Sequence, residues 1–216
     1  MITSRSLVAL VTSVALFAGA CTAAATPAPT PAPTATDGGG SGGSCPTSEP
    51  APLPAGETRT VTIKTSQGEF AIKVDGALSP IAAGNFVALA ECGYYEGVVF
   101  HRLVPGFVIQ GGDPTGDGTG GPGYGITDEP VTALYRRGTV AMARTSAPNS
   151  QGSQFFVVLD DGAAQALASY NTYAIFGEVT TGMDTVDAIA AMPNSGQPNN
   201  SALEPVAMDS VTVSTP

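Results

Sequence analysis

The segment FHRLVPGFVIQGGD, residues 100–113, sets one permanent cation in an apolar stretch and adds an amide side chain shortly after it. An arginine keeps its charge at physiological pH and offers five hydrogen-bond donors but no acceptor, so Arg102 can polarise a substrate but cannot act as a base. Gln110 follows Val108 by two residues and therefore shares its face of a β-strand. Phe107 and Val108 could form the floor of a pocket beside them. This grouping favours chemistry that transfers no proton.

The segment MARTSAPNSQGSQFFVV, residues 142–158, again combines an amide with an aromatic ring, because Gln154 and Phe156 lie on one face of a strand. Together, the two segments resemble the cyclophilin family closely. The resemblance covers most of the chain from about residue 60 to about residue 213. It also includes the stretches NFVALAECGYYEG, GDPTGDGTGGPGYGITDE, YAIFGEV and GMDTVDAIA, which occur in the family's order.

The resemblance implies a mostly β fold, an eight-stranded antiparallel barrel closed by two helices. It also implies a peptidyl-prolyl cis-trans isomerase, which accelerates rotation about X-Pro bonds in proline-containing polypeptides and requires no metal or cofactor. Arg102 would stabilise the amide when it is twisted out of plane. The substrate-binding residues would be Phe107, Val108, Gln110, Ala143, Arg144, Gln154, Phe156, Leu167 and Tyr173.

The resemblance also assigns roles within this set. The wall of the pocket for the proline ring would consist of Phe107, Val108, Phe156 and Leu167. Gln110 and the backbone of Arg144 would hold carbonyl groups of the substrate. Ala143 and Gln154 would line the groove through which the polypeptide runs.

This chain departs from the family pattern at several of these positions. Val108 stands where members usually have Met, and Tyr173 stands where many have His. The best-studied members bind the inhibitor cyclosporin in this groove, with a hydrogen bond from a Trp near the position matched to Leu167. This chain contains no Trp. We therefore expect cyclosporin binding to be weak.

The hydrophobic pattern also predicts mainly short strands and two helices. Strands are expected at 61–65, 69–74, 98–103, 107–110, 139–143, 154–159, 174–179 and 206–213. One helix should start at the capping residue Ser79, followed by Pro80, and end at Gly93. The other should span 183–191. The pattern predicts that the paired charges Asp160–Asp161 and Arg136–Arg137 lie in solvated turns and loops.

Composition bounds the size of the domain and its partners. The chain has 216 residues, of which 43% are apolar, enough for one domain with a substantial core. Its formal net charge of −10 is opposite to what nucleic-acid binding requires, so we expect no nucleic-acid partner. We expect the domain to be a monomer.

The residues near the N-terminus predict an export signal. Residues 7–20 form an apolar run behind Arg5, which is the length of a signal peptide and shorter than the roughly 20 residues of a membrane span. Small residues precede Cys21, in a pattern that resembles a bacterial lipoprotein signal with lipidation of that cysteine. An ordinary secretory signal cleaved nearby is the alternative. We expect an exported protein, anchored through Cys21 to the outer face of the cytoplasmic membrane or to the periplasmic side of a membrane.

The chain is thus expected to have three parts: a signal peptide at 1–20, a lipidated tether rich in Pro, Thr and Gly at 21–56, and an isomerase domain at 57–216. Two further cysteines, Cys45 and Cys92, remain. Export permits a disulfide between them, which would pin the end of the tether to the barrel. The alternative is two unpaired thiols, with Cys92 filling space at the end of a helix.

Two other functions compete with catalysis of X-Pro rotation. One is a non-catalytic peptide-binding module on the same fold. The other is an extracellular hydrolase that uses His101, the only histidine, as a base. The neighbouring charge of Arg102 would disfavour the imidazolium that such a base must become. We therefore expect His101 to be a packed residue.

Overall fold

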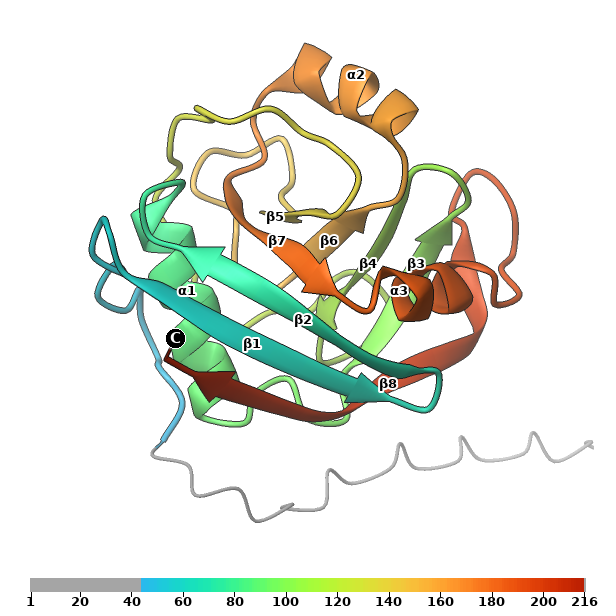
Figure 1. Ribbon diagram of the computed structural model, residues 1–216, viewed down its shortest axis with the longest axis horizontal. Coiled ribbons are helices and arrows are strands. Elements are labelled where there is room, and N and C mark those ends of the chain that lie inside the picture. The colour runs from blue at the N-terminus through green and yellow to red at the C-terminus, as the bar shows by residue number, and fades with distance from the viewer. Residues whose placement is uncertain (1–43, 216) are drawn as a thin grey trace, which may run out of the picture. The chain divides into compact units, whose positions relative to one another are not determined.

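The computed structural model describes residues 44–215, which form one closed barrel of eight antiparallel strands in the order β1-β2-β7-β5-β6-β4-β3-β8 (Figure 1). The strands are β1 (Thr58–Thr65), β2 (Gly68–Asp75), β3 (Val99–Val104), β4 (Val108–Asp113), β5 (Thr139–Met142), β6 (Phe155–Val158), β7 (Ile175–Thr181) and β8 (Ser201–Ser214). Pairing of β1 with β8 closes the barrel. The predicted eight-stranded fold is confirmed.

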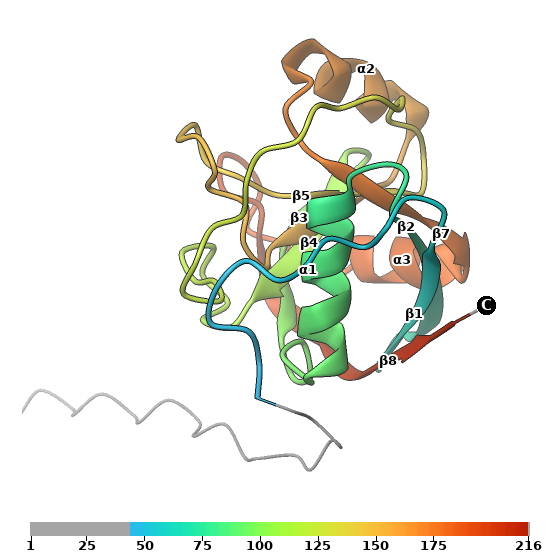
Figure 2. The same cartoon turned by 90° about the vertical axis from the view of Figure 1, so that its left-hand side faces the viewer.

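Three helices accompany the barrel rather than the two expected: α1 (Pro80–Glu91), α2 (Asp161–Tyr170) and α3 (Met183–Ala190). Helices α1 and α3 lie at opposite ends of the barrel, and α2 packs outside it near β6 (Figures 1 and 2). The expectation missed α2 because its sequence is short, rich in Ala and poor in large apolar residues. Its N-cap is Asp160, whose carboxylate accepts a hydrogen bond from the backbone N–H of Gly162.

Helix α1 begins where it was predicted, but its N-terminus is capped differently. The side chain of Ser79 forms no capping hydrogen bond. Instead, the two carboxylate oxygens of Glu129 accept hydrogen bonds from the backbone N–H groups of Ile81 and Ala82, both at 2.9 Å. A carboxylate at this end of a helix also interacts favourably with the helix dipole. The cap therefore comes from a loop far along the chain, and no local pattern indicates it.

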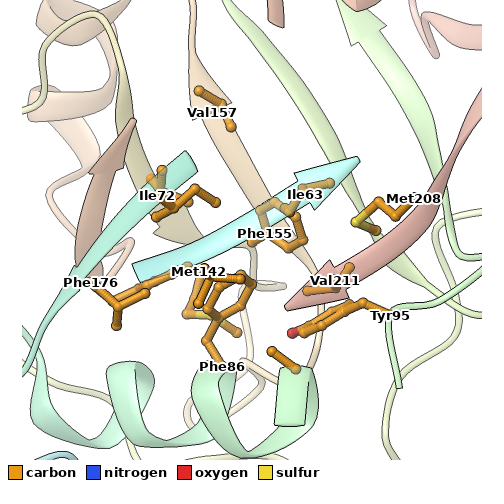
Figure 3. Packing of buried hydrophobic residues seen from close by; sticks show 14 of the residues in the cluster. Ile63, Ile72, Phe86, Tyr95, Met142, Phe155, Val157, Phe176, Met208 and Val211 are labelled. Atoms are coloured by element: carbon orange, nitrogen blue, oxygen red, sulfur yellow. The ribbon is translucent and has the colours of Figure 1, made fainter. Parts of the chain in front are cut away.

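The core fills the inside of the barrel and the space under α1 (Figure 3). Phe86 of α1 is fully buried, and its ring centroid lies 5.2 Å from that of Phe155, 4.7 Å from that of Phe176 and 5.2 Å from that of Tyr95. Aromatic rings at such distances contribute pair interactions in addition to the area that they bury. This packing fixes α1 against strands β6 and β7.

The segment 45–56, expected as the end of the tether, instead packs along α1 (Figure 2). Leu53 is buried, and its backbone N–H donates to the carbonyl oxygen of Pro80 at 2.9 Å. The backbone of the segment approaches α1 at Gly84, where a Cβ atom would lie 2.3 Å from the carbonyl oxygen of Ala51. This segment therefore belongs to the folded domain.

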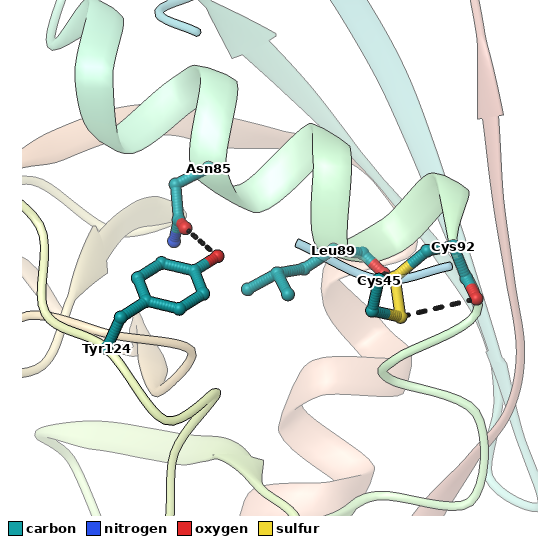
Figure 4. The surroundings of a disulfide bond; sticks show 5 residues. All are labelled: Cys45, Asn85, Leu89, Cys92 and Tyr124. Carbon is teal, nitrogen blue, oxygen red and sulfur yellow. Dashed lines mark hydrogen bonds between the residues drawn. A yellow bond between two sulfur atoms is a disulfide. The ribbon is translucent and has the colours of Figure 1, made fainter. Parts of the chain in front are cut away.

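A disulfide joins Cys45 to Cys92 at the C-terminal end of α1 (Figure 4). It fastens the beginning of the packed segment to the helix. The expected signal peptide at 1–20, Cys21 and the tether up to residue 43 lie outside the described residues. Within residues 44–215, no helix has the length and apolar character needed to cross a membrane.

Candidate active site

Neighbouring strands of the barrel bring the two sequence segments together. Arg102 on β3 is paired in register with Gln110 on β4, and Gln110 is in turn opposite Phe156 on β6. The guanidinium Nη1 of Arg102 donates a hydrogen bond to Oε1 of Gln110 at 3.3 Å. The cation, the amide and the aromatic ring thus occupy adjacent positions on three strands.

A cavity of about 350 Å³ opens in front of these side chains. It is lined by Arg102, Phe107, Val108, Gln110, Ala143, Arg144, Phe156, Leu167, Tyr170 and Tyr173. Its inner wall is apolar, since Val108, Phe156 and Leu167 are almost completely buried. The ring of Phe156 meets that of Tyr173 edge-on, with centroids 5.4 Å apart. The cavity therefore has room for an apolar ring beside the guanidinium of Arg102.

One lining residue was missed by the sequence prediction. Tyr170 lies on α2 one turn after Leu167, and 68% of its surface is exposed at the edge of the cavity. The spacing of three residues places both side chains on one helix face. This signal could have been used only if α2 had been recognised as a helix.

Gln154 is the one predicted groove residue that does not line this cavity. It lines an adjacent cavity of about 390 Å³, which also involves Gln110, Ala143 and the glycine-rich loop. Its Nε2 donates to the carbonyl oxygens of Gly118 at 3.0 Å and Gly120 at 2.9 Å, and its Oε1 accepts from Nε2 of Gln110 at 2.9 Å. Both N–H groups of its amide are therefore used within the protein.

Gln110 keeps one donor free for a substrate. Its Oε1 accepts from Arg102, and one of the two hydrogens on its Nε2 goes to Gln154. Within the described part of the chain, the second hydrogen bonds to no protein atom. Gln110 can therefore donate one hydrogen bond to a carbonyl group in the cavity, as the predicted role requires.

Arg144 lines the cavity, and its side chain is engaged in contacts within the protein. The guanidinium lies 3.1 Å from the carboxylate of Asp128 and donates to the carbonyl oxygen of Ala147 at 2.9 Å. Burial acts to raise the pKa of Asp128, but hydrogen bonds from Asn149 and Gln151, together with the charge of Arg144, lower it overall. These contacts hold the loop that contains Asp128 to the segment 144–151.

His101 is packed, as expected. Only 6% of its surface is exposed, and within residues 44–215 no hydroxyl group hydrogen-bonds to either ring nitrogen. Burial lowers its pKa, and the charge of Arg102 acts in the same direction, whereas Asp113 and Asp117 oppose them. The hydroxyl of Ser153 bonds instead to the carbonyl oxygen of Gly112 at 2.6 Å. Within residues 44–215, His101 is therefore not placed to activate a hydroxyl nucleophile.

Comparisons with known proteins agree with this geometry. The family model described as "Cyclophilin type peptidyl-prolyl cis-trans isomerase/CLD" matches residues 60–213. The chain is 38% identical over 177 residues to the probable peptidyl-prolyl cis-trans isomerase A of Mycobacterium leprae, covering 73% of this chain and 93% of that protein. It is 39% identical over 173 residues to peptidyl-prolyl cis-trans isomerase B of Streptomyces anulatus, covering 71% and 95%.

Among solved structures, a cyclophilin-type peptidyl-prolyl cis-trans isomerase of Cryptosporidium parvum, crystallised in the presence of the dipeptide Ala-Pro, is similar. Its TM-score is 0.65 at 32% sequence identity, over 73% of this chain and 99% of that one. The family match begins in β1 and ends in β8. It therefore spans the whole barrel and both segments that form the cavity.

Proposed function

Because this chain belongs to the cyclophilin family and is a peptidyl-prolyl cis-trans isomerase, we propose that Arg102 is the residue that accelerates rotation of the X-Pro bond. The observation that carries the proposal concerns the arginines of residues 44–215. Arg59, Arg136, Arg137 and Arg144 each form an ion pair with a carboxylate, whereas Arg102 forms none. A cation without a carboxylate partner at the rim of an apolar cavity is free to interact with a substrate.

The reaction needs a group that recognises the twisted amide. Resonance makes rotation of the planar peptide bond slow, with a barrier of roughly 20 kcal/mol. A quarter turn breaks the resonance and returns a lone pair to the prolyl nitrogen. A hydrogen bond from Arg102 to that lone pair stabilises the transition state but hardly the planar ground state, which is the condition for catalysis.

The cavity holds the proline ring while the acyl side of the bond turns. The buried side chains of Val108, Phe156 and Leu167 surround the ring, with Phe107 beside them. The free N–H of Gln110 holds a substrate carbonyl close to Arg102. The substrates are therefore proline-containing polypeptides, and no proton moves during the reaction.

Two variants test the role of Arg102. Arg102→Ala should lose most of the isomerase activity on short X-Pro peptides and still fold, and Arg102→Lys should also be poor because an ammonium lacks the planar fork of a guanidinium. The measurement is the isomerisation rate of purified protein. A parent-like rate for Arg102→Ala would show that another group carries the reaction.

We also propose that the enzyme acts outside the cytoplasm, anchored by a lipid on Cys21, on proteins that have been exported. The support is the apolar run at 7–20 followed by small residues and Cys21. Mass spectrometry of protein extracted from membranes should show an acylated N-terminal cysteine, and Cys21→Ser should release the protein into the soluble fraction. An unmodified mature N-terminus at another residue would favour an ordinary secretory signal.

A further inference from the structure

We propose that Gln154 is a positioning residue for Arg102, and that it sets the orientation of the amide of Gln110 from the glycine-rich loop. This inference rests on the proposed role of Arg102. It assigns to Gln154 a task different from lining the groove, since its amide hydrogens point to the loop and not to a substrate.

The residues form a continuous chain of hydrogen bonds. Nη1 of Arg102 donates to Oε1 of Gln110 at 3.3 Å, and Nε2 of Gln110 donates to Oε1 of Gln154 at 2.9 Å. Nε2 of Gln154 then donates to the carbonyl oxygens of Gly118 and Gly120, at 3.0 and 2.9 Å. The chain therefore runs from the cavity to the backbone of the loop.

The two ends of this chain determine the orientation of both amides. A backbone carbonyl can only accept a hydrogen bond, so Gln154 must turn its NH₂ group toward Gly118 and Gly120. Its oxygen then faces Gln110, which must present its own NH₂ group there. The oxygen of Gln110 is thereby directed toward Arg102, which can only donate. If Gln110 were reversed, its NH₂ group would face the guanidinium, and two donors would be opposed.

The loop end of the chain is itself fixed. Asp113, the last residue of β4, is buried, and its carboxylate accepts hydrogen bonds from the backbone N–H groups of Thr115 and Gly118. At Gly120 a Cβ atom would lie 2.1 Å from Oδ1 of Asp113, so the loop closes tightly over this carboxylate. Burial acts to raise the pKa of Asp113, but these hydrogen bonds lower it overall. The carbonyls that receive Gln154 are therefore held in place.

Two substitutions at Gln154 test the two ends of this chain of hydrogen bonds separately. Gln154→Ala removes every contact of this side chain, so only the bond from Arg102 still orients the amide of Gln110. Gln154→Glu keeps an acceptor for Gln110 but cannot donate to the two loop carbonyls, which would repel its carboxylate. We expect Gln154→Ala to lower kcat for an X-Pro peptide about tenfold and to leave KM within about twofold, because the lost group acts through Arg102. For Gln154→Glu we expect an intermediate loss.

The Arg102→Lys background tests whether Gln154 acts through Arg102. There, adding Gln154→Ala should change the remaining rate less than about twofold, since the lysine cannot use the same geometry. A direct readout comes from the NMR signal of the Arg102 side-chain Nε–H group. This signal should broaden or shift in both Gln154 variants and be unchanged in a control variant.

The control is Gln151→Ala. This amide is also buried and donates to Oδ1 of Asp128, but it has no bond to Gln154, Gln110 or Arg102. It should lower thermal stability without lowering kcat more than about twofold.

Three results would overturn the proposal. They are a parent-like kcat for Gln154→Ala, a rise in KM alone, and a full tenfold further loss in the Arg102→Lys background. If Gln154→Ala does not fold, Gln154→Glu, which retains the size of the side chain, gives the same readouts. If Arg102→Ala itself keeps the parent rate, the proposed function fails. In that case the Arg102 signal still decides whether Gln154 positions this side chain.

Discussion

Two arginines show opposite uses of the same side chain in this molecule. Arg137, just before β5, is fully engaged: its guanidinium donates to both carboxylate oxygens of Asp187 in α3, at 2.9 and 2.6 Å, and also to the carbonyl oxygen of Leu159. In the part of the chain that the structure describes, Arg102 makes one side-chain hydrogen bond, to Gln110, and lines a cavity. A cation that is paired with a carboxylate supports structure, whereas a cation left without one is available to a substrate.

Arg137 bonds to two helices that are distant in the sequence. Its backbone N–H donates to Oδ1 of Asp161 at 2.8 Å, at the beginning of α2, while its side chain holds α3. The bond with Asp187 raises the pKa of Arg137. Arg137 and Asp161 are therefore more than the solvated charges that the sequence suggested. Together they fix the helix that carries Leu167 into the wall of the cavity.

The largest effect should come from removing each arginine in turn. Arg102→Ala should lower kcat/KM about a hundred- to a thousandfold, which is the usual loss when one donor to a transition state is removed. Arg137→Ala should instead lower stability by about 1 kcal/mol, because its ion pair is partly exposed and solvent screens it. Peptide isomerisation and thermal melting of both variants provide the comparison.

The contrast between the two arginines would be wrong if Arg102→Ala and Arg137→Ala behaved alike. A loss of activity in Arg137→Ala as large as that in Arg102→Ala would mean that the position of α2, and not the free cation, limits the rate. Arg136→Ala is a suitable control, since Arg136 also forms a surface ion pair, with Glu178 at 2.8 Å, but does not bond to α2. It should change neither activity nor stability appreciably.

The disulfide belongs to the supporting part of the molecule and should affect stability alone. It closes a sequence separation of 47 residues, and a bond of this kind contributes about 2 to 4 kcal/mol. In a Cys21→Ser background, replacing Cys45 and Cys92 by Ala should lower the free energy of unfolding by about that amount. The isomerisation rate should stay within about twofold. Denaturant unfolding and the peptide assay measure the two quantities.

Thiol labelling tests the bond itself. Protein with Cys21→Ser that is unfolded without reductant should take up no alkylating reagent. Uptake of two labels would mean that Cys45 and Cys92 are free. The segment 45–56 would then be held by Leu53, by its backbone contacts and by the hydrogen bond from the backbone N–H of Thr127 to Glu49.

Inhibition by cyclosporin should be weaker than in family members that have the Trp. We expect about ten- to a hundredfold weaker inhibition, corresponding to one lost hydrogen bond and some lost aromatic contact, or about 1 to 3 kcal/mol. Leu167 is only 3% exposed, so Leu167→Trp would overpack the wall of the cavity. The exposed rim position is Tyr170, and Tyr170→Trp should recover part of the affinity.

An inhibition titration on the parent, Tyr170→Trp and Leu167→Trp distinguishes these positions. Parent inhibition as strong as that of a Trp-containing member would contradict the expected penalty. Recovery in Leu167→Trp but not in Tyr170→Trp would show that the buried wall, and not the rim, contacts the inhibitor.

The sequence predicted the residues that line the cavity better than the contacts that hold the surrounding elements in place, for a physical reason. Arg102, Val108 and Gln110 lie on two consecutive strands, so alternation along a strand and pairing in a hairpin suffice to bring them together. Family resemblance then supplied β6 and its Phe156. Local pattern and resemblance together were sufficient for this part of the site.

The supporting contacts depend on residues distant in sequence. Glu129 caps α1 from a loop 48 residues beyond Ile81, and Arg137 reaches Asp187 across 50 residues. Neither contact has a local sequence signature. A carboxylate or guanidinium in a polar loop has the same kind of neighbouring sequence whether it is paired or solvated. Helix α2 was missed for a similar reason, since it is stabilised by its cap and by Arg137 rather than by a strong apolar face.

The smallest effect is expected from a change of pH, which should act differently on the isomerisation rate and on stability. The rate should be nearly flat between about pH 6 and 8, because the reaction moves no proton and an arginine does not titrate there. The free energy of unfolding, in contrast, should depend on pH. The folded state lowers the pKa of His101, chiefly through burial, so the unfolded chain binds a proton first as pH falls below about 6.5.

The stability that comes from neutral His101 is thus present above about pH 6.5 and is lost as pH falls from there through its folded-state pKa. The lowered pKa values of Asp113 and Asp128 add a second loss, which begins only when pH falls below about 4. Thermal melting from pH 8 to 3 should show both steps, and His101→Gln should remove the first. A rate that instead rises through about pH 6.5, and no longer does so in His101→Gln, would show that the histidine takes part in the chemistry and that Arg102 does not act alone.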